Sequence, residues 1–227
     1  MPRRPRNTPG GTVYHVLNRA VARLTLFEKD EDYAAFERVL AEAMEKHRTR
    51  LLSYLVMPNH WHMVIWPRED GELTDFVRWL THTHVMRWHA RYGTSGTGHL
   101  YQGRFKSFPV ETDAHFYTLL RYVERNALRA NLVKRAEDWR WSSLWRRVHG
   151  DPETLELLHR WPLPEPKDWL RLVNRPQTEA ELKAVRDCVR RGSPYGTSPW
   201  RLRTTKRLGL EWTLRPRGRP RKKETSG

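Results

Sequence analysis

The sequence predicts an α+β fold in which an antiparallel sheet is covered by helices. Three observations favour this class. Short β-branched and aromatic segments alternate with amphipathic helices over residues 12–130, in the order strand, helix, strand, strand, helix, strand, helix. Pro58 and Asn59 can form a tight turn between the second and third strands. The first six elements are those of a ferredoxin-like βαββαβ sheet with its helices on one face, and the seventh adds a further helix.

The first half of this core runs from a strand to a hairpin. Residues 12–17 are β-branched and aromatic, and Asp30 can cap a helix over residues 31–48. Residues 51–57 and 60–66 then have the composition of two strands, separated only by the predicted turn. The hairpin therefore places His60 at the beginning of its second strand.

The second half begins with an amphipathic helix over residues 72–92. The glycine-rich segment 93–98 follows this helix and lacks the lysine of a phosphate-binding loop, so we interpret it as a connector and expect no nucleotide cofactor. A strand over residues 104–111 contains Pro109, which suggests a sheet edge. The helix over residues 114–130 completes the core.

The charge of the chain indicates a polyanionic partner. Lys and Arg number 42 against 26 Asp and Glu, a formal net charge of +16, and eleven Trp supply possible stacking surfaces for bases. Cys188 is the single cysteine, the basic N-terminus has no apolar run behind it, and no stretch resembles a membrane span. We therefore expect a cytoplasmic protein with no membrane partner.

His60 and His62 form a candidate metal site. Residues i and i+2 of a strand point to the same face, so both imidazoles project together while Trp61 points to the other side. His82 and His84 have the same spacing but lie in a predicted helix, where it separates them by about 200°, so they are not expected to chelate. The alternative for His60 and His62 is a pair of ordinary polar sheet residues.

The last core helix carries a candidate nucleophile. On a helical wheel Tyr122 lies opposite the apolar face, on a stripe with Arg125, Asn126 and Arg129. Asn126, one turn after Tyr122, offers an amide oxygen to a hard metal ion, and the two arginines offer guanidinium groups to phosphate. The alternative is a surface tyrosine on a solvated basic face.

Together these residues describe phosphoryl transfer. Two imidazoles and an amide oxygen suit a hard divalent ion such as Mg²⁺ or Mn²⁺, which polarises the non-bridging oxygens of a scissile phosphate. Attack by the Tyr122 phenol would give a phosphotyrosine that a DNA hydroxyl can reverse, because phenolate is a better leaving group than an alkoxide. The predicted reaction is cleavage and transfer of a DNA strand. Arg104 and Lys106 are further candidate DNA contacts.

Several segments resemble the REP-associated tyrosine transposases, a branch of the single-tyrosine HUH transposases. They are Tyr14-His15-Val16 with Asn18-Arg19, Met57-Pro58-Asn59-His60-Trp61-His62, residues 98–105, Arg121-Tyr122-Val123-Glu124-Arg125-Asn126 with Arg129-Ala130, Trp141-Ser142-Ser143, and Gly218-Arg219-Pro220-Arg221. The chain departs from the family's sequence motif at Ala127 and Asn131, where Pro and Gly are expected.

This resemblance implies a ferredoxin-like nuclease core with a metal held by His60, His62 and Asn126. It also implies a covalent 5′-phosphotyrosine at Tyr122, a substrate of single-stranded or hairpin DNA of the repetitive extragenic palindrome type, and a bacterial, nucleoid-associated location. The strongest competing hypotheses are a non-catalytic ferredoxin-like domain that binds hairpin DNA or RNA, and a metal phosphodiesterase that uses water.

Four regions are expected along the chain. Residues 1–11 form a basic disordered arm, residues 12–135 the HUH-type nuclease domain, and residues 136–214 a Trp-rich and Arg-rich extension packed on the core. Residues 215–227 form a basic tail. Its Arg217, Gly218, Arg219, Pro220 and Arg221 resemble the core of an AT-hook peptide and are predicted to bind DNA, either in an A·T-rich minor groove or through phosphates alone.

Overall fold

The computed structural model describes residues 6–150 and 155–215. Within these ranges it contains a four-stranded antiparallel sheet with the strand order β2-β3-β1-β4. The strands are β1 (Val13–Arg19), β2 (Arg50–Met57), β3 (His60–Trp66) and β4 (Lys106–Val110). This order and the connecting helices confirm the predicted ferredoxin-like α+β class.

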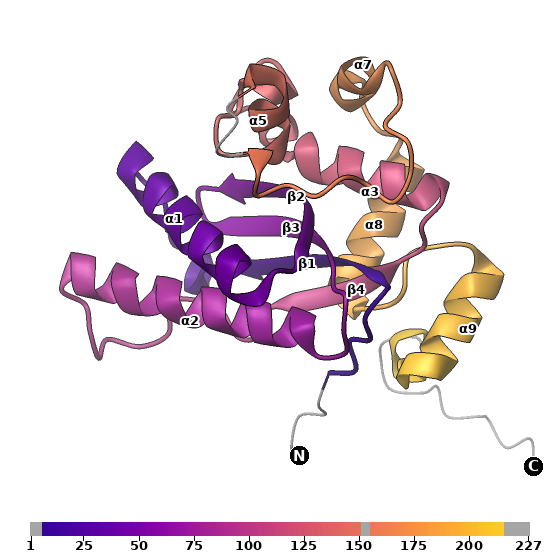
Figure 1. Ribbon diagram of the computed structural model, residues 1–227, viewed down its shortest axis with the longest axis horizontal. Coiled ribbons are helices and arrows are strands. Elements are labelled where there is room, and N and C mark those ends of the chain that lie inside the picture. Colours follow the sequence, from indigo (N-terminus) through magenta and orange to yellow (C-terminus); the bar gives the residue numbers. More distant parts are fainter. Residues whose placement is uncertain (1–5, 151–154, 216–227) are drawn as a thin grey trace, which may run out of the picture.

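The sheet separates two layers of helices (Figure 1). Helices α1 (Asp30–His47) and α2 (Glu72–Tyr92) pack on one face, against side chains that include Val16 and Trp61. Helix α3 (Ala114–Glu124) packs on the opposite face, against Val64 and Phe108. Because strand side chains alternate between faces, each strand contributes to both cores. The ferredoxin-like helices share one face, as predicted, and the added helix covers the other.

The chain after residue 130 supplies more helices than the sequence predicted. In this part of the chain the sequence itself predicts one helix, near residues 178–191, and α8 spans Glu179–Arg191. The structure also has α5 (Ser143–His149), α7 (Trp169–Asn174) and α9 (Ser198–Leu208), together with short 3₁₀ turns at Ala136–Asp138 and Glu211–Thr213. Helix α4 (Asn126–Arg129) continues α3 after a break at Arg125. Helices α5 and α7 contain seven and six residues, too few for a helical period to be visible.

Both edges of the sheet are covered by this extension. At β2, the indole N–H groups of Trp139 and Trp161 donate to the carbonyls of Val56 and Leu52. The backbone N–H of Val56 donates to the Trp141 carbonyl. At β4, Tyr195 donates its backbone N–H to Pro109, the proline that predicted an edge. Open strand edges are sites of unwanted pairing, so the extension completes the fold of the core.

The N-terminal segment is only partly within the described residues. Residues 6–11 were expected to be disordered, but the structure places them along the core: Thr8 is buried, its carbonyl accepts from Gly71, and Gly10 donates to Asp70. Gly10 has no room for a side chain because a Cβ there would lie 2.3 Å from the Arg68 carbonyl oxygen. No helix within the described residues is long and apolar enough to cross a membrane.

Candidate active site

Three histidines meet on the face of the sheet covered by α3. Antiparallel pairing of β1 with β3 places Arg19 opposite His60 and Leu17 opposite His62. The rings of His60 and His62 are 5.0 Å apart between centroids, and Trp61 points into the other core, as strand alternation predicts. The third histidine is His15 of β1, whose ring stacks on His62 at 5.1 Å. His15 lies in a segment quoted for the family resemblance, but the sequence prediction did not place it in the site.

The hydrogen bonds of His60 and His62 leave one nitrogen of each ring for a ligand. The Nδ1 of His60 lies 2.6 Å from the Asn59 Oδ1, an atom that can only accept, so His60 carries its proton on Nδ1. The Nδ1 of His62 lies 2.9 Å from the His15 Nε2. In both rings Nε2 is the remaining nitrogen. Protein metal sites typically use this arrangement, in which the second nitrogen is held by a neighbouring group.

Burial keeps all three rings neutral. Loss of hydration is the main cause that lowers the pKa of His60 to about 3, and the positive charges of Arg19 and Arg129 add to it. Burial also lowers the pKa of His15 to about 3 and that of His62 well below its ordinary value. A neutral imidazole has a free lone pair, so these rings can bind a cation without first losing a proton.

Tyr122 is buried beside these histidines, which corrects the helical-wheel prediction. Its exposed fraction is 8%, and its ring lies edge-on to His62 at 6.0 Å and to His15 at 6.4 Å between centroids. The wheel placed it on a solvent-facing stripe because it assumed one buried side. Helix α3 instead lies between the sheet and α7 and α8, so several of its faces are buried, and the Tyr122 ring is on the side that contacts β1 and β3. Asn126 is also buried.

Asn126, one turn after Tyr122, is hydrogen-bonded to Arg129. The Nη2 of Arg129 donates to the Asn126 Oδ1 at 2.7 Å, and both terminal nitrogens of Arg129 lie 3.4 Å from the Tyr122 carbonyl oxygen. An amide oxygen has a second lone pair, so Asn126 still has an acceptor position. The Arg129 guanidinium, predicted to bind phosphate, is thus engaged within the site.

Two other arginines have buried nitrogens that lack a hydrogen-bond partner within the described residues. They are the Nε of Arg19, the cross-strand neighbour of His60, and the Nη1 of Arg125. Burial and the nearby charge of Arg121 lower the pKa of Arg125. Unsatisfied guanidinium groups favour an anion, because phosphate oxygens would supply the missing acceptors. In the sequence, Arg19 belongs to a segment that resembles the family, but no role was predicted for it.

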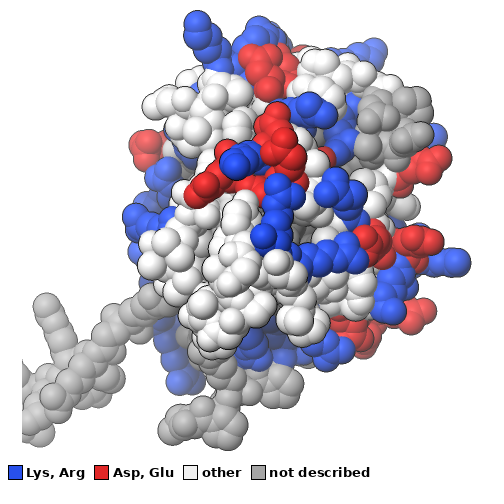
Figure 2. Space-filling model, turned by 90° about the vertical axis from the view of Figure 1, so that its left-hand side faces the viewer, with Lys and Arg blue, Asp and Glu red and all other residues white. Residues whose placement is uncertain are grey.

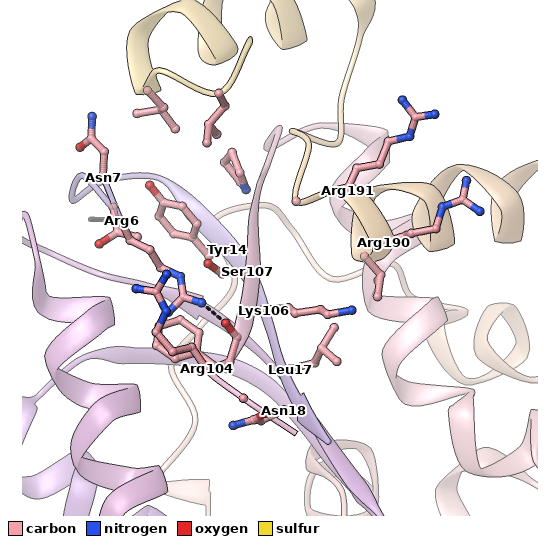
Figure 3. Close-up of a pocket in the computed structure, with 18 of the residues that line it drawn as sticks. Arg6, Asn7, Tyr14, Leu17, Asn18, Arg104, Lys106, Ser107, Arg190 and Arg191 are labelled. Atoms are coloured by element: carbon pink, nitrogen blue, oxygen red, sulfur yellow. Dashed lines mark hydrogen bonds between the residues drawn. The ribbon is translucent and has the colours of Figure 1, made fainter. Parts of the chain in front are cut away.

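A basic groove of about 850 Å³ is lined by residues of β1 and β4 together with the N-terminal segment and the end of α8. Figure 3 shows Arg6 and Asn7 of the N-terminal segment on one side, Arg190 and Arg191 of α8 on the other, and Lys106 between them. Arg6 donates to the Phe105 carbonyl oxygen and its guanidinium carbon lies 3.7 Å from the Phe105 ring centre. The groove also includes the predicted contact Arg104 and, beside His60, Arg19.

The positive charge is not spread evenly. The face shown in Figure 2 carries acidic and basic side chains together with a wide uncharged area. Local ion pairs such as Arg87 with Glu42 and Arg78 with Asp75 balance charges on α1 and α2. The lining of the groove, by contrast, contains several basic side chains and no Asp or Glu. An anionic chain would therefore be attracted to the groove.

A separate acidic cluster lies at the beginning of α3. Among the described residues, Glu111, Asp113 and His115 bring potential metal-ligand atoms within 4.8 Å of one another. Asp113 caps α3 by accepting from the backbone N–H of His115, and Glu111 accepts from the backbone N–H of Thr197. These bonds give the cluster a structural role, in helix capping and in fastening the extension to β4.

The other histidine pair is used in the core. His84 is buried with its Nδ1 2.8 Å from the Tyr101 hydroxyl, whereas His82 of the same helix is exposed. They do not share a face, which agrees with the expectation that they do not chelate a metal together.

The sequence model of the transposase IS200-like family matches residues 10–126. This range is just over half of the 227 residues and includes His60, His62, Tyr122 and Asn126. The chain belongs to the IS200-like transposase family. The resemblance detected from the motifs is thereby confirmed at the level of this family, and the model ends before the Trp-rich extension begins.

A solved structure supports the fold of this IS200-like transposase, and a second one is less similar. A REP-associated tyrosine transposase bound to a REP hairpin has a TM-score of 0.53 and 18% identity, over 66% of this chain and 86% of that chain. A candidate transposase from Deinococcus radiodurans R1 has a TM-score of 0.39 and 16% identity, over 55% of this chain and 96% of that chain. A search of curated proteins gave no match.

Proposed function

We propose that this IS200-like transposase cleaves and rejoins single-stranded or hairpin DNA through a covalent bond to Tyr122. One observation carries the proposal: within the family core, Tyr122 lies beside His62, whose ring packs on His60, in a pocket of neutral imidazoles. A purely structural tyrosine would not need two neighbouring rings whose Nε2 atoms are left for a ligand. The similarity in fold to a REP-associated tyrosine transposase agrees with this assignment.

In the proposed reaction the Tyr122 Oη forms a bond to phosphorus, and the bond from phosphorus to the 3′ oxygen breaks. The phenol loses its proton, the released 3′ oxygen takes one up, and a 5′-phosphotyrosine remains. The reverse attack by a DNA 3′-hydroxyl rejoins a strand and restores the phenol. The reaction needs no nucleotide cofactor, because the energy of the phosphodiester is kept in the phosphotyrosine.

His60 and His62 would hold a divalent metal ion through Nε2, and Asn126 through its remaining amide lone pair. Asn59 and His15 fit this role, because they occupy both Nδ1 atoms and so direct Nε2 toward a ligand. Bound there, Mg²⁺ or Mn²⁺ would polarise the scissile phosphate and offset its developing charge. Arg19 and Arg125, with their unsatisfied nitrogens, would bind oxygens of the same phosphate or a neighbouring one.

The basic groove would hold the strand that leads to the site. Its lining includes Arg19, the cross-strand neighbour of His60, and also Arg104 and Lys106, both predicted from sequence to contact DNA. Trp212 is 54% exposed at the groove, where an unpaired base can stack on it. The predicted AT-hook residues Arg217, Gly218, Arg219, Pro220 and Arg221 lie outside the described residues, and their DNA binding stays a proposal.

The proposal is tested with an end-labelled hairpin that carries single-stranded flanks. The protein is incubated with this DNA and Mg²⁺ or Mn²⁺, and the products are separated by denaturing electrophoresis. Label that stays linked to the protein is the expected result. Free cleaved DNA would indicate attack by water, and uncleaved but bound DNA would indicate a binding domain, so either result would overturn the covalent mechanism.

A further inference from the structure

His15 is a buried imidazole that lies between the proposed metal site and the core. It is 0% exposed, and its ring is 4.9 Å from Phe108 and 5.1 Å from His62 between centroids. Its Nδ1 is buried and has no hydrogen-bond partner within the described residues. A buried polar nitrogen without a partner costs free energy, so an apolar side chain would be more stable here unless the imidazole has a function.

The contact between His15 and His62 limits where their protons can lie. A neutral imidazole has one N–H and one lone pair, so the 2.9 Å contact between the His15 Nε2 and the His62 Nδ1 joins one of each. If His62 donates, its Nε2 keeps the lone pair that a cation needs, and His15 carries its proton on the unpartnered Nδ1. If His15 donates, His62 carries its proton on Nε2 and cannot bind a cation.

We propose that His15 is a positioning residue that selects the metal-binding tautomer of His62 by accepting a hydrogen bond from its Nδ1. Asn59 does the same for His60, since the amide oxygen 2.6 Å away can only accept. The unpartnered Nδ1 of His15 then has an explanation, because it is where the proton must lie when His62 is ready to bind. This inference rests on the proposed metal site at His60 and His62.

Three variants separate positioning from packing. In His15→Gln an amide oxygen can still accept from the His62 Nδ1, whereas His15→Leu fills the space without an acceptor. His84→Leu is the matched control, because it removes another buried imidazole, bonded to the Tyr101 hydroxyl on the opposite face of the sheet. Affinity for Mn²⁺ alone is measured by electron paramagnetic resonance of free Mn²⁺, without DNA.

We expect His15→Leu to weaken Mn²⁺ binding about 10- to 100-fold, the usual effect of losing a group that orients a metal ligand. His15→Gln should stay within about fivefold of the wild type, a difference near 1 kcal/mol, and His84→Leu should bind like the wild type. Wild-type affinity in His15→Leu would overturn the role of His15. A wild-type protein that does not bind Mn²⁺ would instead overturn the metal site itself.

Nuclear magnetic resonance of the wild-type protein with Mg²⁺ decides the matter even if His15→Leu does not fold. The imidazole nitrogens are observed through long-range ¹H–¹⁵N correlations. The proposal requires a proton on the Nδ1 of both His15 and His62, and a coupling across the hydrogen bond between the His62 Nδ1 and the His15 Nε2. A proton on the His15 Nε2, or two rings without that coupling while Mg²⁺ is bound, would overturn it.

Discussion

The Arg129 guanidinium lies over the ring of Tyr122, with its central carbon 4.4 Å from the ring centre. The same group donates to the Asn126 Oδ1 at 2.7 Å. One side chain therefore contacts the proposed nucleophile and the proposed third metal ligand. Because a guanidinium is planar and has donors along its edges, it can stack on a ring and bond an amide at once. Its burial on this site suggests that it orients both groups.

Replacing Arg129 by Lys or Ala should slow cleavage of bound DNA. A lysine ammonium cannot reproduce the planar guanidinium that stacks on the ring and donates from its edge. A hydrogen bond from a charged donor contributes about 1.5 to 3 kcal/mol, so we expect a loss of about 10- to 100-fold in the single-turnover rate. Hairpin affinity should change by less than about threefold if the group is used internally. A large loss of affinity with an unchanged rate for bound DNA would show instead that Arg129 is a phosphate contact.

Replacing His60 or His62 by Ala should abolish cleavage at every tested concentration of Mg²⁺ or Mn²⁺, because a site with three protein ligands loses affinity and geometry together when one ligand is removed. Asn126→Ala should retain part of the activity, since water can replace a neutral oxygen ligand. His82→Ala is the matched control, a histidine exposed on α2. Cleavage by the wild type that continues in excess EDTA would contradict the metal assignment.

Acid should destabilise the fold through its buried histidines. His15, His60 and His84 have pKa values of about 3 in the folded protein against 6.5 for an ordinary imidazole. Below pH 6.5 the unfolded chain therefore binds more protons than the folded protein does. The free energy of unfolding has its full contribution from these histidines above pH 6.5 and loses it between pH 6.5 and about 3.

Urea unfolding at a series of pH values measures this loss. Each histidine contributes a slope of about 1.4 kcal/mol per pH unit below its unfolded pKa. His84→Leu removes one such group outside the site, so its stability should decline less steeply than that of the wild type between pH 6.5 and the folded pKa of about 3. Equal slopes for the two proteins would show that His84 is not held neutral by burial.

Glu124 fastens the extension to the core. It is completely buried and accepts from Ser53 at 3.0 Å and from the Trp169 indole at 2.8 Å, and Arg147 lies 3.5 Å away. Burial raises the pKa of this carboxyl, which Arg147 and the hydrogen bonds oppose. Glu124→Ala would leave the Arg147 charge without its partner, so we expect a loss of about 3 to 5 kcal/mol in the free energy of unfolding.

Trp169→Phe is the milder companion variant, with an expected loss of about 1 to 3 kcal/mol from one hydrogen bond. A double-mutant cycle with Glu124→Ala should show a coupling above about 0.5 kcal/mol, since the two side chains touch. Additive effects in urea unfolding would mean that the hydrogen bond contributes nothing.

The sequence predicted the core well because its signals are local. The composition of residues 60–66 after the predicted turn and the amphipathic pattern of residues 72–92 gave bounds that match β3 and α2. The burial of Tyr122 was not predictable in this way, since its ring packs against His15 and His62 of the sheet and under Arg129, and the two histidines are distant in sequence. His15 lies in the Tyr14-His15-Val16 segment that resembles the family, but it was given no role in the site, because its partner His62 is distant in sequence.

The identity of the residue that becomes linked to DNA tests the account most directly. After reaction with a hairpin and Mg²⁺, the adduct is digested with nuclease and trypsin and mapped by mass spectrometry. Trypsin cuts after Arg121 and Arg125, so Tyr122 lies in a peptide whose only other residues are Val123, Glu124 and Arg125. The account predicts a nucleotide on Tyr122 in this peptide and no adduct in Tyr122→Phe. A nucleotide on any other peptide, or an adduct that persists in Tyr122→Phe, would contradict it.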